Sequence, residues 1–182
     1  MKRLISAMFV ATIFSSNCFA AEAKTIETRL YSAAIPSVSV AGGGQWNRFA
    51  RVGASDDLVI SQGSSGELYS ATIRVKRNSG IKGLPDLQAS TGLNGVAFAK
   101  VDFTKKSQAN LLCVQPAMTG NVRPFPDGSI FTKIMACIDT NTDIYYELSV
   151  SWKVLDPNKV HNRPADGLSV AANEFFAGFS TK

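Results

Sequence analysis

The sequence predicts an α+β fold, in which an antiparallel β-sheet of about six or seven strands carries a short central helix and a C-terminal amphipathic helix packed on it. Apolar residues alternate from Ile144 to Val154, several other β-rich runs are separated by turn residues, and phenylalanines recur at helical spacing near the C-terminus. The 182 residues, 45% hydrophobic and 18% charged, are typical of one globular domain. This composition excludes long disorder, a collagen and a polytopic membrane protein.

The first twenty residues predict a cleaved secretory signal peptide. A basic start at Lys2-Arg3 precedes an apolar run over 4–14, and small residues occupy the peptidase positions of Cys18-Phe19-Ala20. Cleavage after Ala23 is the alternative. The run is too short to span a bilayer, and the residues before Cys18 do not resemble a lipobox. We therefore expect a signal peptide over 1–20, a single α+β domain over 21–182, a periplasmic or secreted location and no stable membrane insertion after cleavage.

Charge gives little indication of a nucleic-acid partner. Without Lys2 and Arg3, Lys plus Arg falls from 19 to 17 while Asp plus Glu stays at 14, which leaves a mild charge of +3. The basic groups at 74–82 and 100–106 are neither dense nor interleaved with aromatic residues. We interpret them as solvated basic faces and expect no nucleic-acid binding.

The two cysteines that remain after cleavage, Cys113 and Cys137, predict a structural disulfide. An even pair in an oxidising compartment is expected to be bonded, and loop-closure entropy assigns roughly 3 to 4 kcal/mol to a ring of this length. Neither a Cys-x-x-Cys spacing nor a basic neighbour indicates a reactive thiol.

The C-terminal half predicts three neighbouring strands. Ile144–Val154 alternates cleanly, Ile130–Ile138 is β-rich, and the turn residues of 139–143 between them indicate a hairpin. A third strand, Leu111–Gln115, must lie beside this hairpin for the cysteines to meet, since bridged Cα atoms lie within about 7 Å.

Further strands are expected upstream, and two helices complete the prediction. The strands cover Ser37–Ala41, Trp46–Val52, Asp57–Ser61, Leu68–Lys76 and Val96–Phe103, with a Gly/Ser hairpin loop over 62–67. Pro85 in a first turn and Gly92 just past the end predict a helix over Leu84–Ser90. Six apolar residues within Pro164–Phe179 predict an amphipathic helix that packs three phenylalanines on the sheet.

This order of elements resembles the PsbP/Mog1-like α/β sandwich over about residues 35 to 179. The features that carry the resemblance are an extended Ile35-Pro36, a Gly-rich turn, Trp46, the helix after Gly83-Leu84-Pro85, a long hairpin and a Phe-rich last helix. The cysteine pair and the triple glycine 42–44 do not map onto that family. The resemblance implies a small non-catalytic binding or assembly protein, since exported bacterial members include envelope factors and toxin-neutralising proteins.

Residues for catalysis or metal binding are sparse. The single histidine, His161, lies in a polar segment, and no Gly-x-Ser-x-Gly elbow accompanies it. One imidazole and two oxidised cysteines cannot form a multi-His or thiolate zinc site. Gly42-Gly43-Gly44 lacks the Lys-Ser/Thr of a phosphate loop. We expect no catalytic residues, no cofactor and no metal.

Two acidic pairs could bind a hard cation or act as acid and base, but both fit turns better. Asp56-Asp57 precedes a strand, whereas Asp139 and Asp143 bracket the expected hairpin turn without the spacing of a calcium loop.

The Pro-rich segment 116–128 is the candidate binding site. It places Met118, Arg123 and Phe125 between prolines and lies wholly between the cysteines. Arg and aromatic residues on a preorganised loop are typical anchors of protein interfaces, although they could also fold back over the sheet. We expect a non-enzymatic binding protein with a protein partner, most concretely an immunity or inhibitor protein that neutralises a cell-wall enzyme. A structural or assembly factor of the envelope and a hydrolase with an unrecognised acidic site are the alternatives.

Overall fold

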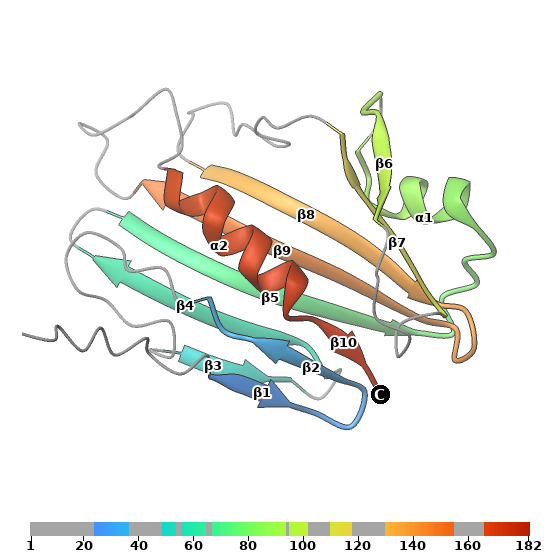
Figure 1. Cartoon of the computed structure of the whole chain (residues 1–182), viewed down its shortest axis with the longest axis horizontal. Coiled ribbons are helices and arrows are strands. Elements are labelled where there is room, and N and C mark those ends of the chain that lie inside the picture. Colours follow the sequence, from blue (N-terminus) through green and yellow to red (C-terminus); the bar gives the residue numbers. More distant parts are fainter. Residues whose placement is uncertain are drawn as a thin grey trace, which may run out of the picture.

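Two antiparallel sheets and two helices form the fold (Figure 1). The computed structural model describes residues 24–36, 49–53, 56–64, 67–93, 95–101, 110–117, 130–154 and 166–182. The strands are β1 (Thr25–Glu27), β2 (Tyr31–Ala34), β3 (Phe49–Val52), β4 (Leu58–Ser64), β5 (Glu67–Arg77), β6 (Phe98–Val101), β7 (Leu111–Pro116), β8 (Ile130–Asp139), β9 (Ile144–Val154) and β10 (Ser180–Thr181). The helices are α1 (Leu84–Ser90) and α2 (Asp166–Ala177).

The larger sheet has seven strands in the order β3-β4-β5-β9-β8-β7-β6. Its centre is the pairing of the two longest strands, β5 and β9, which runs from Glu67 opposite Val154 to Arg77 opposite Ile144. Strands β8 and β9 form the expected hairpin, with Asp139 opposite Ile144. The predicted antiparallel sheet of about six or seven strands is therefore confirmed.

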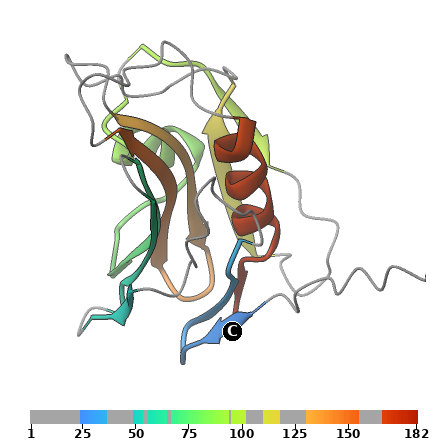
Figure 2. The same cartoon turned by 90° about the vertical axis from the view of Figure 1, so that its left-hand side faces the viewer.

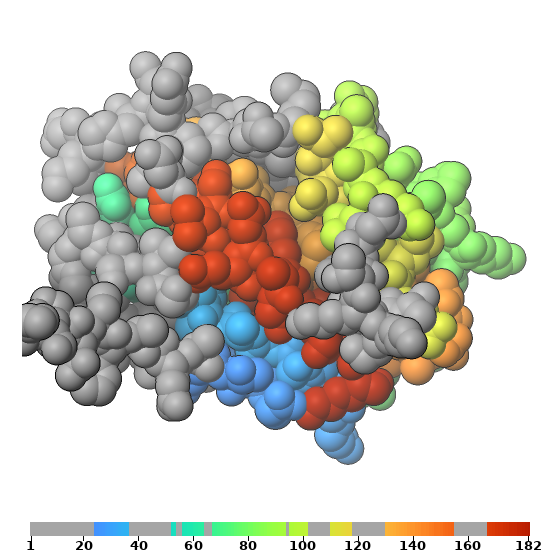
Figure 3. Space-filling view, in the orientation of Figure 1, coloured from blue at the N-terminus to red at the C-terminus, as the bar shows by residue number. Residues whose placement is uncertain are grey.

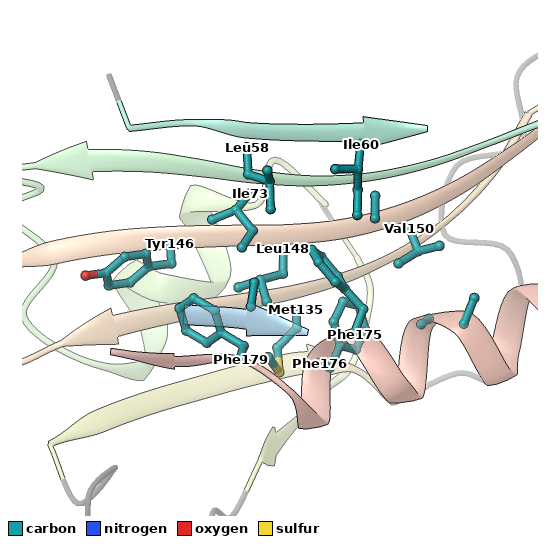
Figure 4. Close-up of a cluster of buried hydrophobic side chains, with 14 of the residues drawn as sticks. Leu58, Ile60, Ile73, Met135, Tyr146, Leu148, Val150, Phe175, Phe176 and Phe179 are labelled. Atoms are coloured by element: carbon teal, nitrogen blue, oxygen red, sulfur yellow. The ribbon is translucent and has the colours of Figure 1, made fainter. Parts of the chain in front are cut away.

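Alternation along the strands gives this sheet one continuous apolar face. In β9, Tyr146, Leu148, Val150 and Trp152 are buried on the side that α2 covers. Phe175 and Phe176 of α2, and Phe179 just after it, pack against this face of the sheet. The sheet residues in this cluster include Leu58, Ile60, Ile73 and Met135 (Figure 4). The amphipathic helix thus packs as predicted, although it ends at Ala177.

A second, three-stranded sheet in the order β1-β2-β10 was not predicted. It lies with α2 over the same face of the large sheet (Figures 2 and 3). Three aromatic rings join the layers: Tyr146 of β9 meets Tyr31 of β2 at 6.1 Å and Phe179 at 5.2 Å between ring centroids. Strands β1 and β10 have three and two residues, too few to produce a periodic pattern, so this layer appears only in their pairing with β2.

Helix α1 lies on the opposite side of the large sheet from α2 (Figure 2). Leu87 is fully buried against Val114, Ala136, Ile138 and Tyr145, which alternate with the residues that face α2. The helix has the predicted bounds, with Pro85 in its first turn and Gly92 at a φ of 67° after its end. At the start of β9, α1 also buries Tyr145, on the face opposite to that of Tyr146.

The other predicted strands agree with the structure within a few residues where it describes them. Strand β4 extends to Ser64 and β5 begins at Glu67, so the hairpin loop is shorter than expected. Strand β6 covers only Phe98–Val101 of the expected Val96–Phe103, and β3 covers Phe49–Val52 of the expected Trp46–Val52. The expected strand Ser37–Ala41, all of Gly42-Gly43-Gly44, Trp46 and Pro164 lie outside the described residues.

Candidate functional site

Cys113 of β7 and Cys137 of β8 form the predicted disulfide. The two residues are direct partners in the β7–β8 ladder, with Cα atoms 4.1 Å apart. Both side chains are fully buried and face the main core beside Tyr146 and Met135. Because no solvent reaches the sulfur atoms, this pair fits a structural cross-link better than a reactive thiol.

The cross-linked strands flank the candidate binding segment. Strand β7 ends at Pro116 and the adjacent, antiparallel β8 begins at Ile130, so one connection joins two neighbouring strands. The main-chain N–H of Ala117, at the start of that connection, donates a 2.8 Å hydrogen bond to the carbonyl of Ala97. Met118, Arg123 and Phe125 themselves lie outside the described residues. Their binding role stays a prediction.

The first acidic pair stabilises the turn between β3 and β4. The Asp57 side chain accepts a 2.7 Å hydrogen bond from the Val75 N–H, and Asp56, at a φ of 65°, forms an ion pair with Arg77 at 2.5 Å. The Tyr31 hydroxyl donates to the main-chain carbonyl of Asp56 at 2.8 Å. These contacts are those of a turn, as the sequence suggested.

The second acidic pair holds the β8–β9 turn. Asp139 accepts hydrogen bonds from the N–H groups of Asn141 and Thr142, at 2.9 and 3.4 Å. Asp143, at a φ of 51°, accepts from the Ser79 hydroxyl at 2.7 Å and links this turn to the segment before α1. The interpretation of these aspartates as turn residues is confirmed.

His161 lies outside the described residues. Within the described ranges, no group of three or more His, Cys, Asp or Glu side chains is placed to hold a metal ion. In the same part of the chain, no helix has the length and apolar character needed to cross a membrane.

The structure reveals one surface that sequence reasoning missed, which we name the open face. It is the side of β4, β5, β8 and β9 opposite α2, next to the area that α1 covers, and none of the described elements packs over it. Its residues are Val59, Ser61, Leu68, Ser70, Thr72, Arg74, Lys76, Ile130, Thr132, Ile134, Glu147, Ser149, Ser151 and Lys153. Polar residues alternate with apolar residues along each of these strands in the sequence. Strands β5 and β9 are far apart in the sequence, however, and only their pairing brings the polar residues of both onto one surface.

Small hydroxyl side chains near the centre of the open face bond to one another, and Ile134 of β8, 5% exposed, lies beside Ser149. Thr72 and Ser149 share a 2.6 Å hydrogen bond between their hydroxyl groups across β5 and β9. Thr132 and Ser151 share a 2.9 Å hydrogen bond across β8 and β9. Val59, with 42% of its surface exposed, lies beside Thr72 in the neighbouring strand. In each pair one hydroxyl donates and the other accepts, so each bond uses one of the two hydroxyl protons of the pair.

Cations surround this centre. Arg74 contacts Glu147 at 3.6 Å, and the Arg74 side chain keeps 75% of its surface exposed. Lys76 and Lys153 are exposed at the two ends of the face. Glu147 also accepts a 3.1 Å hydrogen bond from the hydroxyl of Tyr145, whose pKa is raised well above its usual value, mainly by burial. The one carboxylate of this surface is therefore already partnered, and the face has an excess of positive charge.

Comparisons of this chain with protein-family models, with curated proteins and with solved structures found no match. The resemblance to the PsbP/Mog1-like sandwich stays a prediction.

Proposed function

We propose that this chain is an exported, non-enzymatic protein that binds another protein through the segment between β7 and β8. Most concretely, it acts as an immunity or inhibitor protein that neutralises a cell-wall enzyme directed at the envelope. The observation that carries the proposal is the disulfide between the two strands that flank Met118, Arg123 and Phe125.

The supporting argument concerns the entropy of binding. A loop that becomes ordered on binding loses conformational freedom, which costs about 0.5–1.5 kcal/mol per immobilised side chain. The disulfide joins β7 and β8, Pro116 pairs with Phe98 of β6 and Ile130 pairs with Lys153 of β9, so the sheet already holds both ends of the segment in the free protein. The prolines at 116, 124 and 126 limit the unbound conformations further. Arg123 and Phe125 are the residue types that anchor protein interfaces.

Affinity purification of the mature chain from an envelope extract tests the proposal. We expect a cell-wall hydrolase to co-purify, and Arg123→Ala and Phe125→Ala each to weaken its binding at least about tenfold, in keeping with a hot-spot loss of about 2 kcal/mol. The melting temperature of both variants should stay unchanged. Arg29→Ala, at an exposed arginine in the turn before β2, is the matched control and should bind like the wild type.

Unchanged binding by both loop variants would remove the segment from this proposal. Co-purification with structural envelope proteins would favour an assembly factor instead. His161→Ala addresses the hydrolase alternative, because loss of an acid or base costs about 10²-fold in rate. We expect no hydrolytic activity that depends on this residue.

A further inference from the structure

We infer that α1 is a hinged cover, which lifts off the large sheet as a separate unit and exposes an apolar strip while the main core stays folded. This inference concerns the side of the sheet opposite α2 and does not depend on the proposed partner. It is carried by three observations, namely a small apolar cluster under α1, hydrogen bonds that are local to the α1 segment and a fixed point at the β8–β9 turn.

The large sheet separates the apolar cluster under α1 from the main core. Leu87 of α1 is fully buried on one face of the sheet, whereas Leu168 of α2 is fully buried in the main core on the other face. Figure 2 shows the two helices on opposite sides of the sheet. The buried residues under α1 are Val114, Ala136, Ile138 and Tyr145. Lifting α1 therefore uncovers these side chains and leaves the packing of α2 on the sheet intact.

A small part of α1 attaches it to the sheet. Leu87 is the buried residue of the helix, and Leu84 packs partly against the same cluster. Near the end of the helix, the hydroxyl of Ser90 hydrogen-bonds to that of Tyr145. The exposed residues of the helix are Pro85, Asp86, Ala89 and Ser90. The Leu87 side chain is therefore the main anchor of α1 on the sheet.

The hydrogen bonds at the two ends of α1 lie within its own segment. Before the helix, the Lys82 N–H donates to the Asp86 carboxylate at 3.0 Å. At its end, the Thr91 hydroxyl donates to the Gln88 carbonyl at 2.7 Å. These bonds stabilise the helix but do not attach it to the sheet. A helix of seven residues is unstable alone in water, so opening of α1 is the local unfolding of a small unit.

The unit is fixed to the sheet on its N-terminal side. The Ser79 N–H donates to the Asp143 carbonyl at 3.3 Å, and the Ser79 hydroxyl donates to the Asp143 carboxylate at 2.7 Å. Gly80 follows at a φ of 69°, and a Cβ atom there would have no other atom within 4 Å. Backbone conformation rather than space therefore favours glycine at this position. Because glycine also has the widest choice of other conformations, we place the hinge at Gly80.

Native-state hydrogen exchange of the mature protein tests the inference. The N–H groups of Leu87, Thr91 and Gly92 report on α1, because each donates to a carbonyl within the segment. Those of the β5–β9 ladder report on global unfolding. We expect the α1 amides to be protected at least about tenfold less than the ladder amides. Below the unfolding transition, urea should accelerate exchange strongly in the ladder and little in α1, since global unfolding exposes far more surface.

Two leucine variants separate local opening from global unfolding. Leu168→Ala weakens the main core, which stays folded when α1 lifts. It should accelerate exchange in the β5–β9 ladder about thirtyfold or more and change exchange in α1 less than about threefold. Leu87→Ala, at the other fully buried leucine, should accelerate exchange in α1 about thirtyfold or more. The ladder should accelerate in this variant as well, because the native state loses stability relative to the unfolded chain.

Three results would overturn the inference. Equal protection and equal urea dependence of the α1 and ladder amides would show that α1 opens only with the whole fold. Equal acceleration of both by Leu168→Ala would show the same. Unchanged exchange of α1 in Leu87→Ala would show that the helix frays without leaving the sheet. If Leu168→Ala does not fold, Val150→Ala makes the same test with a smaller deletion at a fully buried position of the main core.

Discussion

Gly178, directly after α2, lies against Ala34 of β2 so closely that it has no space for a side chain. A Cβ atom on Gly178 would overlap the Ala34 Cβ and come within 3.2 Å of the Ala34 nitrogen. The Ala34 N–H also donates a 3.3 Å hydrogen bond to the Gly178 carbonyl. This contact brings the end of α2 onto the small sheet.

Gly178→Ala should therefore destabilise the protein by about 1–3 kcal/mol, because the added methyl forces α2 and β2 apart. Urea unfolding monitored by circular dichroism measures the loss. Combining Gly178→Ala with Ala34→Gly removes the opposing methyl and should recover part of the stability. If the single variant unfolds like the wild type, the close packing of α2 on β2 is wrong.

Replacement of both cysteines tests the disulfide as a structural element. Cys113→Ala with Cys137→Ala should lower the free energy of unfolding by roughly 3 to 4 kcal/mol through the lost chain constraint. The reduced wild-type protein, unfolded in the presence of a thiol, is the control, because it lacks the disulfide but keeps both sulfur atoms that the alanine variant removes from the core. We expect reduction to require unfolding, because both side chains are fully buried. Rapid reduction of the native protein by a mild thiol would contradict this burial.

Alkaline pH should destabilise the fold through its tyrosines. Burial raises the pKa of Tyr69 and of Tyr146 to about 12, and it raises those of Tyr31 and Tyr145 further. Because the folded state disfavours tyrosinate, this contribution to stability is complete below the ordinary pKa of 10.0 and is lost as the pH rises from there toward about 12.

Tyrosinate absorbance of folded and urea-unfolded protein checks this prediction. The unfolded chain should titrate near its ordinary pKa of 10.0, and the folded chain should titrate later. The urea midpoint should fall over the same pH range. Superimposable titration curves would show that the tyrosines are not buried in the native protein.

Asp143 provides a test of the acidic turn. Asp143→Ala removes the acceptor for the Ser79 hydroxyl and puts alanine at a φ of 51°, so it should cost about 1–3 kcal/mol. Asp143→Asn keeps an acceptor oxygen and tolerates this backbone conformation, and it should cost less than about 1 kcal/mol. Equal stability of the two variants in urea would contradict the structural role of this carboxylate.

Local patterns predicted much of the large sheet and both helices. The alternation of Ile144–Val154 and the proline and glycine around Leu84–Ser90 gave the bounds of β9 and α1 as the structure has them. The pairing of Cys113 with Cys137 was predicted from the number of cysteines that would remain after cleavage of the expected signal peptide. In each case the information lies within one short stretch or in a simple count.

Long-range pairing could not be predicted in this way. Strand β10 contains two residues and joins β2, which lies almost at the other end of the described chain. The open face forms only when Thr72 of β5 comes beside Ser149 of β9. Ser and Thr are polar in either strand alone, and nothing local indicates that their hydroxyl groups bond to each other.

Site-specific photo-crosslinking tests the central claim, that the segment tethered between β7 and β8 binds a protein partner. A photoreactive phenylalanine analogue replaces Phe125 in one sample and Val170, exposed on α2, in the other. The account predicts a discrete cross-linked protein from position 125 and none from position 170. No cross-link at position 125, or the same product from both positions, would contradict it.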